Sequence, residues 1–365
     1  MPTPEKSGHT LKHIARVASV AAGQLREFLL SGGAQQQGPS HAGAVAGTIS
    51  HGSVYYVYGE ITGYYLHWLA SLQGSSNEIS SRAQAAAQWL EQYLQSGAVP
   101  ATRIYLDTQV EDWRNKALFA FDFAMMAGGL ARAEARGLLK PSVTLLALLL
   151  GWLQQFVDGD RLKTCIVHDK TVVLPARWST RGGSFTAKTA SRILLLSRQA
   201  TVHPALVNAC DNILLTCAAA AHHNGFDMTH PTLYAIEGCL LADAVDYEKL
   251  AHWFDQIVAL QAPDGSLPES LETPEVRRTD VIAQALRVAV FLSRLTGQPG
   301  RYQEASIKFA VALCARVRKN GSIGFTAGNI GEDNIWCAMF AEQALRLYAA
   351  DLRDEPLPFV MEDLV

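Results

Sequence analysis

The chain has 365 residues, of which 49% are hydrophobic and 18% are charged, and its formal net charge is −3. The apolar content is ample for a packed core, so the composition excludes an intrinsically disordered protein. The balance of charges gives no electrostatic reason to expect a nucleic-acid partner.

The cysteines and the N-terminal sequence indicate a cytoplasmic protein. Six cysteines are spread along the chain without any CxxC pair, which favours free buried thiols over a disulfide framework or a metal site. Free thiols are typical of a reducing compartment. The first residues are polar and lack the apolar core of a signal peptide. The most apolar window, 143–157, is too short to span a bilayer.

Two kinds of helical pattern alternate along the chain. One kind is amphipathic and predicts helices of an outer layer; its segments are 11–30, 79–94, 141–157, 203–221, 247–260 and 301–317. The other kind is apolar on nearly all sides, and its segments begin near Tyr58, Trp113, Phe185, Pro231, Asp280 and Asn334. A helix that is apolar all round must be buried all round, so these segments predict an inner ring.

The starts of the apolar helices recur roughly every 50 residues, which equals two helices and two loops. We therefore predict an all-α fold, a single (α/α)6 barrel over residues 11–352, with a disordered N-terminus at 1–10 and a C-terminal tail at 353–365. A two-domain helical bundle is the alternative, but it would need a linker, and no low-complexity break occurs in the middle of the chain.

Two stretches interrupt the helical pattern. The long interval before Phe185 contains an insertion, 158–181, for which we predict a short β-hairpin around 160–180. Loops of this length are often functional. The stretch 31–53 is rich in Gly, Ser, Gln and His and is a candidate for a mobile flap over the first inner helix.

Several helix starts resemble motifs of one group of proteins. Residues 58–64, YGEITGY, resemble the Y-x-E-x-T-G-Y helix start of six-hairpin proteins of polysaccharide metabolism. Residues 107–110, DTQV, resemble the D-T-G-Q-V element of the same group, without its glycine. Residues 230–238 resemble the fourth inner helix, H-T-x-x-Y-x-x-x-G, and residues 334–345 resemble the closing inner helix.

The resemblance covers most of the chain in order and spacing, and it implies the same (α/α)6 barrel. The superfamily contains polysaccharide lyases, uronyl epimerases, glycoside hydrolases and terpene-cyclase-like or prenyltransferase-like toroids. It therefore implies a fold more than a single reaction.

Two pairs of side chains near helix starts suit acid–base chemistry. Glu60 and Tyr64 are one turn apart and share a face, and a carboxylate among tyrosines is expected to have a raised pKa. The alternative is that Glu60 only stabilises the helix start through the helix dipole. His230 and Tyr234 also share a face, and they suit proton abstraction next to a uronic carboxylate, although a lone histidine is often structural.

Asp280 is the candidate for a second carboxyl group. It begins the fifth inner helix, which places it opposite Glu60 across the ring, and two carboxyl groups from different hairpins are what glycoside hydrolysis needs. The alternative is that Asp280 caps its own helix.

The remaining helix starts carry side chains that suit sugar binding. Aromatic rings stack on sugar faces, and an arginine can hold a carboxylate or phosphate through two hydrogen bonds. The candidates are Tyr58, Asp107, Trp113, Trp178, Arg181, Arg278, Asn334 and Trp336.

Metal and cofactor motifs are missing from the sequence. His222 and His223 are adjacent and do not face the same way on a helix, so we expect no shared metal. Cys239 lies too deep in its helix for a zinc set, and no phosphate-binding or nucleophile motif occurs. We expect no cofactor.

The sequence thus predicts a cytoplasmic carbohydrate-active enzyme that processes a glycan or uronic-acid-containing saccharide by metal-free acid–base catalysis. Lyase, epimerase and glycoside hydrolase reactions stay open, and polysaccharide biosynthesis is a candidate role. One alternative is a terpene-cyclase-like or prenyltransferase-like toroid, against which the absence of DxDD and DDxxD counts. The other is a toroid that binds a glycan or a protein without catalysis.

Overall fold

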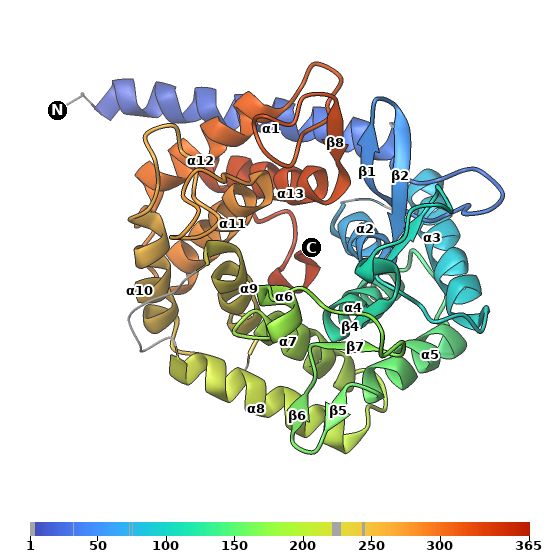
Figure 1. Cartoon of the computed structure of the whole chain (residues 1–365). Coiled ribbons are helices and arrows are strands. Elements are labelled where there is room, and N and C mark those ends of the chain that lie inside the picture. The colour runs from blue at the N-terminus through green and yellow to red at the C-terminus, as the bar shows by residue number, and fades with distance from the viewer. Residues whose placement is uncertain (1–3, 32, 73, 75, 221–227, 243–244) are drawn as a thin grey trace.

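The computed structural model describes residues 4–31, 33–72, 74, 76–220, 228–242 and 245–365. Two concentric layers of helices form a ring (Figure 1). The inner helices are α2 (Gly59–Ser71), α4 (Ala120–Ala135), α7 (Thr186–Ser197), α9 (Thr229–Cys239), α11 (Thr279–Leu295) and α13 (Ile335–Leu352). Each contacts the next, and α13 contacts α2. The predicted (α/α)6 barrel is confirmed.

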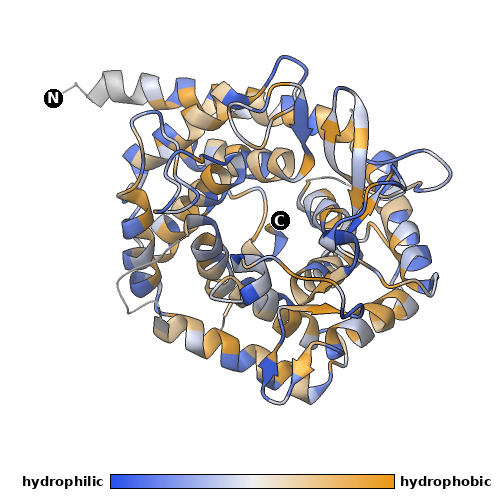
Figure 2. Ribbon diagram, in the orientation of Figure 1, coloured by the Kyte–Doolittle hydropathy of each residue, from blue (hydrophilic) through white to orange (hydrophobic). Residues whose placement is uncertain are grey.

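The outer layer pairs each inner helix with an amphipathic one. These helices are α1 (Pro4–Ser31), α3 (Asn77–Gln95), α5 (Val143–Gln154), α8 (Pro204–Ala220), α10 (Tyr247–Val258) and α12 (Gln303–Arg316). Hydrophilic and hydrophobic residues alternate along them (Figure 2). By contrast, every residue of α2 and α9 is buried. A helix that is buried on one side therefore belongs to the outer layer, and a helix that is buried on all sides belongs to the inner ring.

Helices α2 and α4 approach each other closely because glycines face each other at their contact. A Cβ atom on Gly129 would lie 2.2 Å from the carbonyl oxygen of Gly63, and one on Gly63 would lie 2.7 Å from the backbone of Met125 and Met126. This close packing brings the starts of the two helices together at one end of the ring.

A four-stranded antiparallel sheet with strand order β3-β2-β1-β8 lies at that end (Figure 1). Its strands are β1 (Ala46–Ser50), β2 (Ser53–Tyr58), β3 (Arg103–Tyr105) and β8 (Glu332–Asn334). The turn between β1 and β2 contains His51 and Gly52, which both have positive φ angles, as a two-residue hairpin turn requires. Part of the segment interpreted as a flap is thus strand β1, hydrogen-bonded on both sides.

The insertion differs in detail from the prediction. A hairpin is present, but β5 (Val157–Asp158) and β6 (Arg161–Leu162) form it at the start of the segment. Strand β7 (Cys165–Val167) pairs with β4 (Ala117–Phe119). Because β4 and the short helix η1 (Trp113–Asn115) come first, the second inner helix begins at Ala120 and not near Trp113. The tiny helix α6 (Trp178–Arg181) ends the insertion.

The two ends of the chain also differ from the prediction. Helix α1 begins at Pro4, so residues 4–10, expected to be disordered, are helical, and proline is favourable in a first turn. The segment predicted as a tail returns to the centre of the ring (Figure 1). It contains the short helix η2 (Met361–Asp363), and Phe359, Asp363, Leu364 and Val365 are buried.

The structure shows the state of the cysteines and the character of the helices among the described residues. The six cysteines, all within the described residues, are free. Among the helices that the structure describes, none combines the length and apolar character needed to cross a membrane.

Candidate active site

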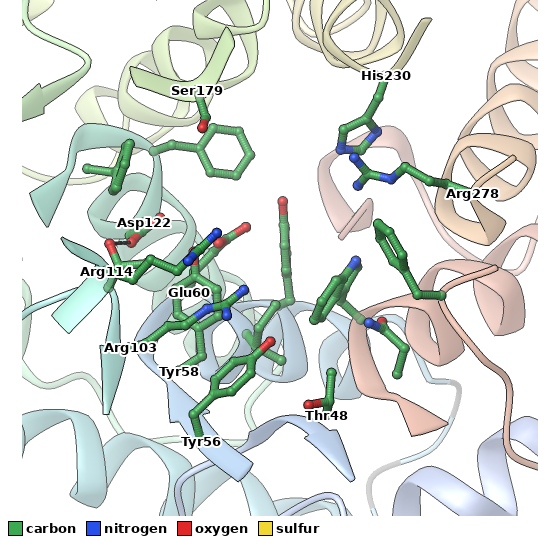
Figure 3. Close-up of a pocket in the computed structure, with 18 of the residues that line it drawn as sticks. Thr48, Tyr56, Tyr58, Glu60, Arg103, Arg114, Asp122, Ser179, His230 and Arg278 are labelled. Carbon is green, nitrogen blue, oxygen red and sulfur yellow. Dashed lines mark hydrogen bonds between the residues drawn. The ribbon is translucent and has the colours of Figure 1, made fainter. Parts of the chain in front are cut away.

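A cavity of about 660 Å³ opens at the end of the ring where the inner helices begin (Figure 3). Every inner helix contributes a lining residue at or just before its start: Glu60, Asp122, Phe185, His230, Arg278 and Asn334. The sheet adds Thr48, Tyr56 and Arg103 to the same cavity. The ring thus gathers side chains from distant parts of the sequence into one site.

Most of the residues expected to form a site line this cavity. They are Tyr58, Glu60, Tyr64, Trp113, Trp178, His230, Tyr234, Arg278, Asn334 and Trp336. Asp107, Arg181 and Asp280 are not among the lining residues. Asp107 lies in an exposed turn, where Oδ1 accepts a hydrogen bond of 2.9 Å from the backbone N–H of Gln109. Arg181 is exposed at the end of α6.

Asp280 is a structural partner of Arg278 and not a free carboxyl group. Its two oxygens accept hydrogen bonds of 3.0 and 2.6 Å from the Arg278 guanidinium, and the indole of Trp336 donates another of 3.1 Å. Burial alone would raise the pKa of Asp280, but Arg278 outweighs burial and the pKa is lowered to about 2. Asp280 is therefore charged and orients two lining residues, which argues against the expected acid–base pairing with Glu60.

Glu60 is paired instead with Asp122, which was not among the residues expected to form the site. The two carboxyl groups hydrogen-bond each other, and Thr102 Oγ1 donates a bond of 2.9 Å to Asp122. Burial raises the pKa of Glu60, and burial together with the charge of Glu60 raises that of Asp122 well above its ordinary value. Two carboxyl groups in such contact cannot both ionise easily, so the pair retains a proton.

Two tyrosines connect the carboxyl pair to the opposite wall. The hydroxyl of Tyr64 is close enough to Glu60 to act on its pKa and lies 3.2 Å from the hydroxyl of Tyr234. The ring of Tyr234 packs on the ring of His230 with centroids 4.4 Å apart. Burial raises the pKa of both tyrosines well above the ordinary value, so both remain protonated.

His230 lies on the wall opposite the carboxyl pair (Figure 3). Only 3% of it is exposed, and its Nδ1 lies 2.6 Å from Oε1 of Gln284. Burial, and then the positive charge of Arg278, lower the pKa of His230 to about 3. The imidazole is therefore neutral at physiological pH and has one nitrogen free to act as a base.

Arginines from four different segments also line the cavity. Arg278 pairs with Glu269 and Asp280, and Arg114 pairs with Asp112. Arg103 stacks on Tyr56, and its Nε is buried without a hydrogen-bond partner among the described residues. Burial, and then Arg114 and Arg278, lower the pKa of Arg177. Such a gathering of like charges favours an anionic ligand.

A metal site is not evident in the described part of the chain. There, no group of three or more His, Cys, Asp and Glu side chains lies close enough to hold an ion. His222 and His223 fall outside the described residues.

The sequence offered a weak signal for the missed carboxyl group. Asp122 is the one charged residue in the apolar run 117–130, and a charge in an otherwise buried helix needs a reason. Because this helix was predicted to begin near Trp113, Asp122 was expected at least one turn inside it. Its place at the cavity was therefore not predicted.

Comparisons with known proteins support the fold. No protein-family model matches the chain, and no curated protein matches it by sequence. The solved structure of a cellobiose 2-epimerase from Spirochaeta thermophila is similar with a TM-score of 0.72 and 14% identity, covering 97% of this chain and 99% of that one.

Two further solved structures are similar over nearly their whole length. A D-mannose isomerase matches with a TM-score of 0.68 and 14% identity, over 91% of this chain and 96% of its own. An unsaturated glucuronyl hydrolase specific for heparin matches with a TM-score of 0.60 and 12% identity, over 94% and 98%. At these identities the likeness establishes the six-hairpin toroid fold alone.

Proposed function

We propose that this protein is a carbohydrate-active enzyme that transfers a proton at the carbon next to the carboxylate of a uronic-acid-containing saccharide. The observation that carries the proposal is the arrangement of a proton-holding carboxyl pair and a neutral histidine on opposite walls of one cavity. An acid and a base on either side of a substrate are what epimerisation and β-elimination both need.

The positions of His230, the arginines and the carboxyl pair give each of them a role in the proposed reaction. His230 removes the proton from the carbon next to the carboxylate, and the negative charge that develops on the substrate carboxylate is stabilised by the arginines. The Glu60–Asp122 pair then donates its proton. Donation to the opposite face of the same carbon inverts it, whereas donation to the leaving glycosidic oxygen completes an elimination.

Binding of a saccharide is supported by the aromatic side chains of the cavity. Trp113, Trp178 and Trp336 line it together with several tyrosines. Flat rings of this kind pack well against the apolar faces of sugars. Several proteins of similar structure are sugar epimerases, an isomerase and a glucuronyl hydrolase, which supports a carbohydrate substrate.

Direct hydrolysis is the less favoured reaction. The two carboxyl groups of a glycosidase are about 5 Å apart or more, because the bond to be cleaved lies between them. Glu60 and Asp122 are in hydrogen-bond contact, and Asp280 is held by Arg278. The carboxyl pair therefore suits one proton donor better than a donor and a nucleophile.

One assay distinguishes these reactions. Disaccharides that end in glucuronate or in glucose are incubated with the protein in D₂O and followed by proton NMR. We expect turnover of the glucuronate compounds only, seen as loss of the signal of the proton next to the carboxylate or as a new alkene signal. Cleavage into two saturated sugars without an alkene signal would indicate hydrolysis, and no turnover of any uronate compound tested would overturn the proposal.

A further inference from the structure

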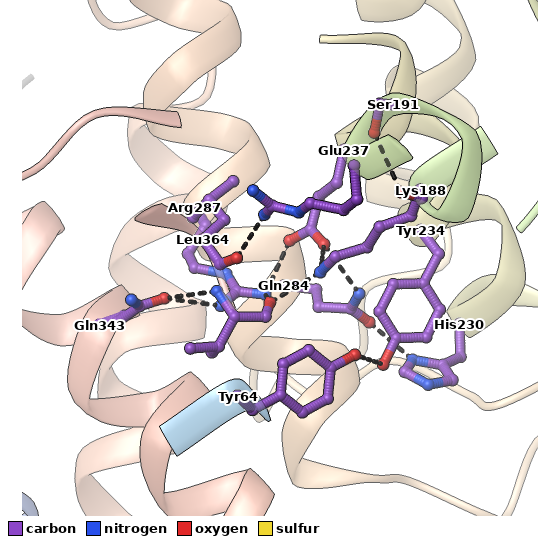
Figure 4. Close-up of polar contacts among 12 residues, drawn as sticks. Tyr64, Lys188, Ser191, His230, Tyr234, Glu237, Gln284, Arg287, Gln343 and Leu364 are labelled. Atoms are coloured by element: carbon purple, nitrogen blue, oxygen red, sulfur yellow. Dashed lines mark hydrogen bonds and ion pairs between the residues drawn. The ribbon is translucent and has the colours of Figure 1, made fainter. Parts of the chain in front are cut away.

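A chain of side chains beneath the cavity leads from His230 to a buried carboxylate (Figure 4). Nδ1 of His230 lies 2.6 Å from Oε1 of Gln284, and Nε2 of Gln284 donates a hydrogen bond of 3.3 Å to Glu237. Gln284 and Glu237 have exposed fractions of 0% and 1%. Gln284 and Glu237 are therefore shielded from bulk water, so the hydrogen bond between them has no competing water partner.

The charge of Glu237 determines the direction of every hydrogen bond in this chain. Lys188 donates to Glu237 at 2.8 Å and Arg287 donates at 2.7 Å. Burial alone would raise the pKa of Glu237, but the charges of Arg287 and Lys188 lower it. The ionised carboxylate can only accept, so the amide NH₂ of Gln284 must face it.

The orientation of Gln284 then fixes the proton on His230. Its Oε1 faces the imidazole and can only accept, so Nδ1 must carry the proton and Nε2 is left with its lone pair. Turning the amide over would place Oε1 against the carboxylate of Glu237, where two acceptors repel each other.

We propose that Gln284 is a positioning residue: oriented by Glu237, it holds His230 in the tautomer with the proton on Nδ1 and leaves Nε2 as the base. The assignment of the tautomer rests on geometry alone. Only the role of Nε2 in proton transfer rests on the proposed function.

The other groups around His230 do not replace Gln284. Tyr234 packs its ring on the imidazole and directs its hydroxyl to Tyr64, and Trp178 contacts the imidazole edge-on at 5.6 Å. Arg278 and Asp280 act on His230 through their charges, and they are bonded to each other. Removal of the Gln284 amide should therefore leave Nδ1 without its acceptor.

The tautomer can be measured directly in the full chain. Histidine labelled with ¹⁵N reports which ring nitrogen is protonated, and the His230 signals are assigned by their loss in His230→Gln. We expect a protonated Nδ1 and an unprotonated Nε2 at pH 7 in the wild type. Gln284→Leu removes the acceptor and should shift the proton toward Nε2.

A matched control separates positioning from packing. Gln343→Leu replaces another fully buried glutamine, which bonds Arg287 and not His230, and it should leave the His230 signals unchanged. Proton on Nε2 in the wild type, or unchanged signals in Gln284→Leu, would overturn the inference.

Turnover separates this inference from the proposed function. On the glucuronate disaccharide, kcat of Gln284→Leu should fall about 10- to 100-fold with little change in KM. If the tautomer shifts as expected but turnover does not depend on it, the positioning of His230 stands and the proposed role of His230 as the base fails.

Discussion

At the residue scale, the carboxyl pair of Glu60 and Asp122 is the most unusual feature. Both are buried, and among the described residues they interact with hydroxyl groups and with each other while no cation is hydrogen-bonded to either. Burying a carboxylate without a cation costs stability. Such a cost is expected where a group is kept for chemistry.

The pair predicts an unusual dependence of stability on pH. Because the pKa of Asp122 is raised in the folded state, its contribution to stability is present at low pH and is lost as the pH rises through the folded pKa. Asp122→Asn removes the charge and keeps the shape. We expect it to stabilise the protein by about 1–3 kcal/mol at pH 8 and hardly at all at pH 4, measured by chemical denaturation.

Asp112→Asn is the matched control for this prediction. Burial raises the pKa of Asp112, but hydrogen bonds from Arg114 and Tyr105 lower it on balance. Its contribution is therefore present at neutral pH and lost as the pH falls, so the substitution should destabilise at pH 8. Destabilisation of similar size by both substitutions would contradict the account of the carboxyl pair.

The arginines of the cavity are expected to select substrates that carry a carboxylate. Arg177 lies at the cavity among other positive charges, so Arg177→Gln should leave stability unchanged and raise KM for the glucuronate disaccharide about 10-fold. Arg181→Gln changes an exposed arginine four residues away and should leave KM unchanged. Equal KM values for the two variants would show that Arg177 does not contact the substrate.

At the scale of elements, the contact between α2 and α4 positions the carboxyl pair. Gly63 and Gly129 let the two backbones meet, and the starts of both helices then lie side by side. The position of the pair thus depends on these two glycines.

Gly129→Ala tests this contact. Its new methyl group would overlap the carbonyl oxygen of Gly63, so we expect a loss of about 1–3 kcal/mol in the free energy of unfolding. Gly151→Ala in α5, where nothing lies within 4 Å of the new Cβ, should stabilise by roughly 0.5–1 kcal/mol through its higher helix propensity. Similar effects of both substitutions in thermal denaturation would contradict the packing account.

Elements also show what sequence reasoning can and cannot predict. Periodicity of apolar residues is local, and it predicted both layers of the ring because burial on one side or all sides leaves a direct pattern in the sequence. The pairing of β1 with β8 and of Glu60 with Asp122 joins segments far apart in the chain, and no local pattern encodes it. Asp280 was expected to be a free carboxyl group although its main partner, Arg278, is only two residues away, because the sequence does not show toward which group an arginine side chain points.

At the scale of the whole molecule, the side chain of Glu342 links the first and last hairpins of the ring. This fully buried carboxylate accepts hydrogen bonds from Arg26 in α1, Trp68 in α2 and Arg346 in its own helix α13. The first and last hairpins are thereby joined through one side chain, which supports closure of the ring.

Glu342→Gln should weaken this closure in a pH-dependent way. Burial alone would raise the pKa of Glu342, but Arg346 and Arg26 lower it, so its contribution is present above the unfolded pKa and is lost as the pH falls through the folded pKa. We expect a loss of about 3 kcal/mol at pH 7 that shrinks below about pH 4. A loss that is constant between pH 3 and 7 would contradict an ionic link.

In the proposed function, the ring places an acid and a base on opposite walls of one cavity. The most direct test is the rate of turnover of a glucuronate disaccharide in D₂O by the wild type, Glu60→Gln and His230→Gln, each checked for folding by its melting temperature. The account predicts that the folded variants are each at least about 100-fold slower than the wild type. Wild-type rates in both variants would contradict it.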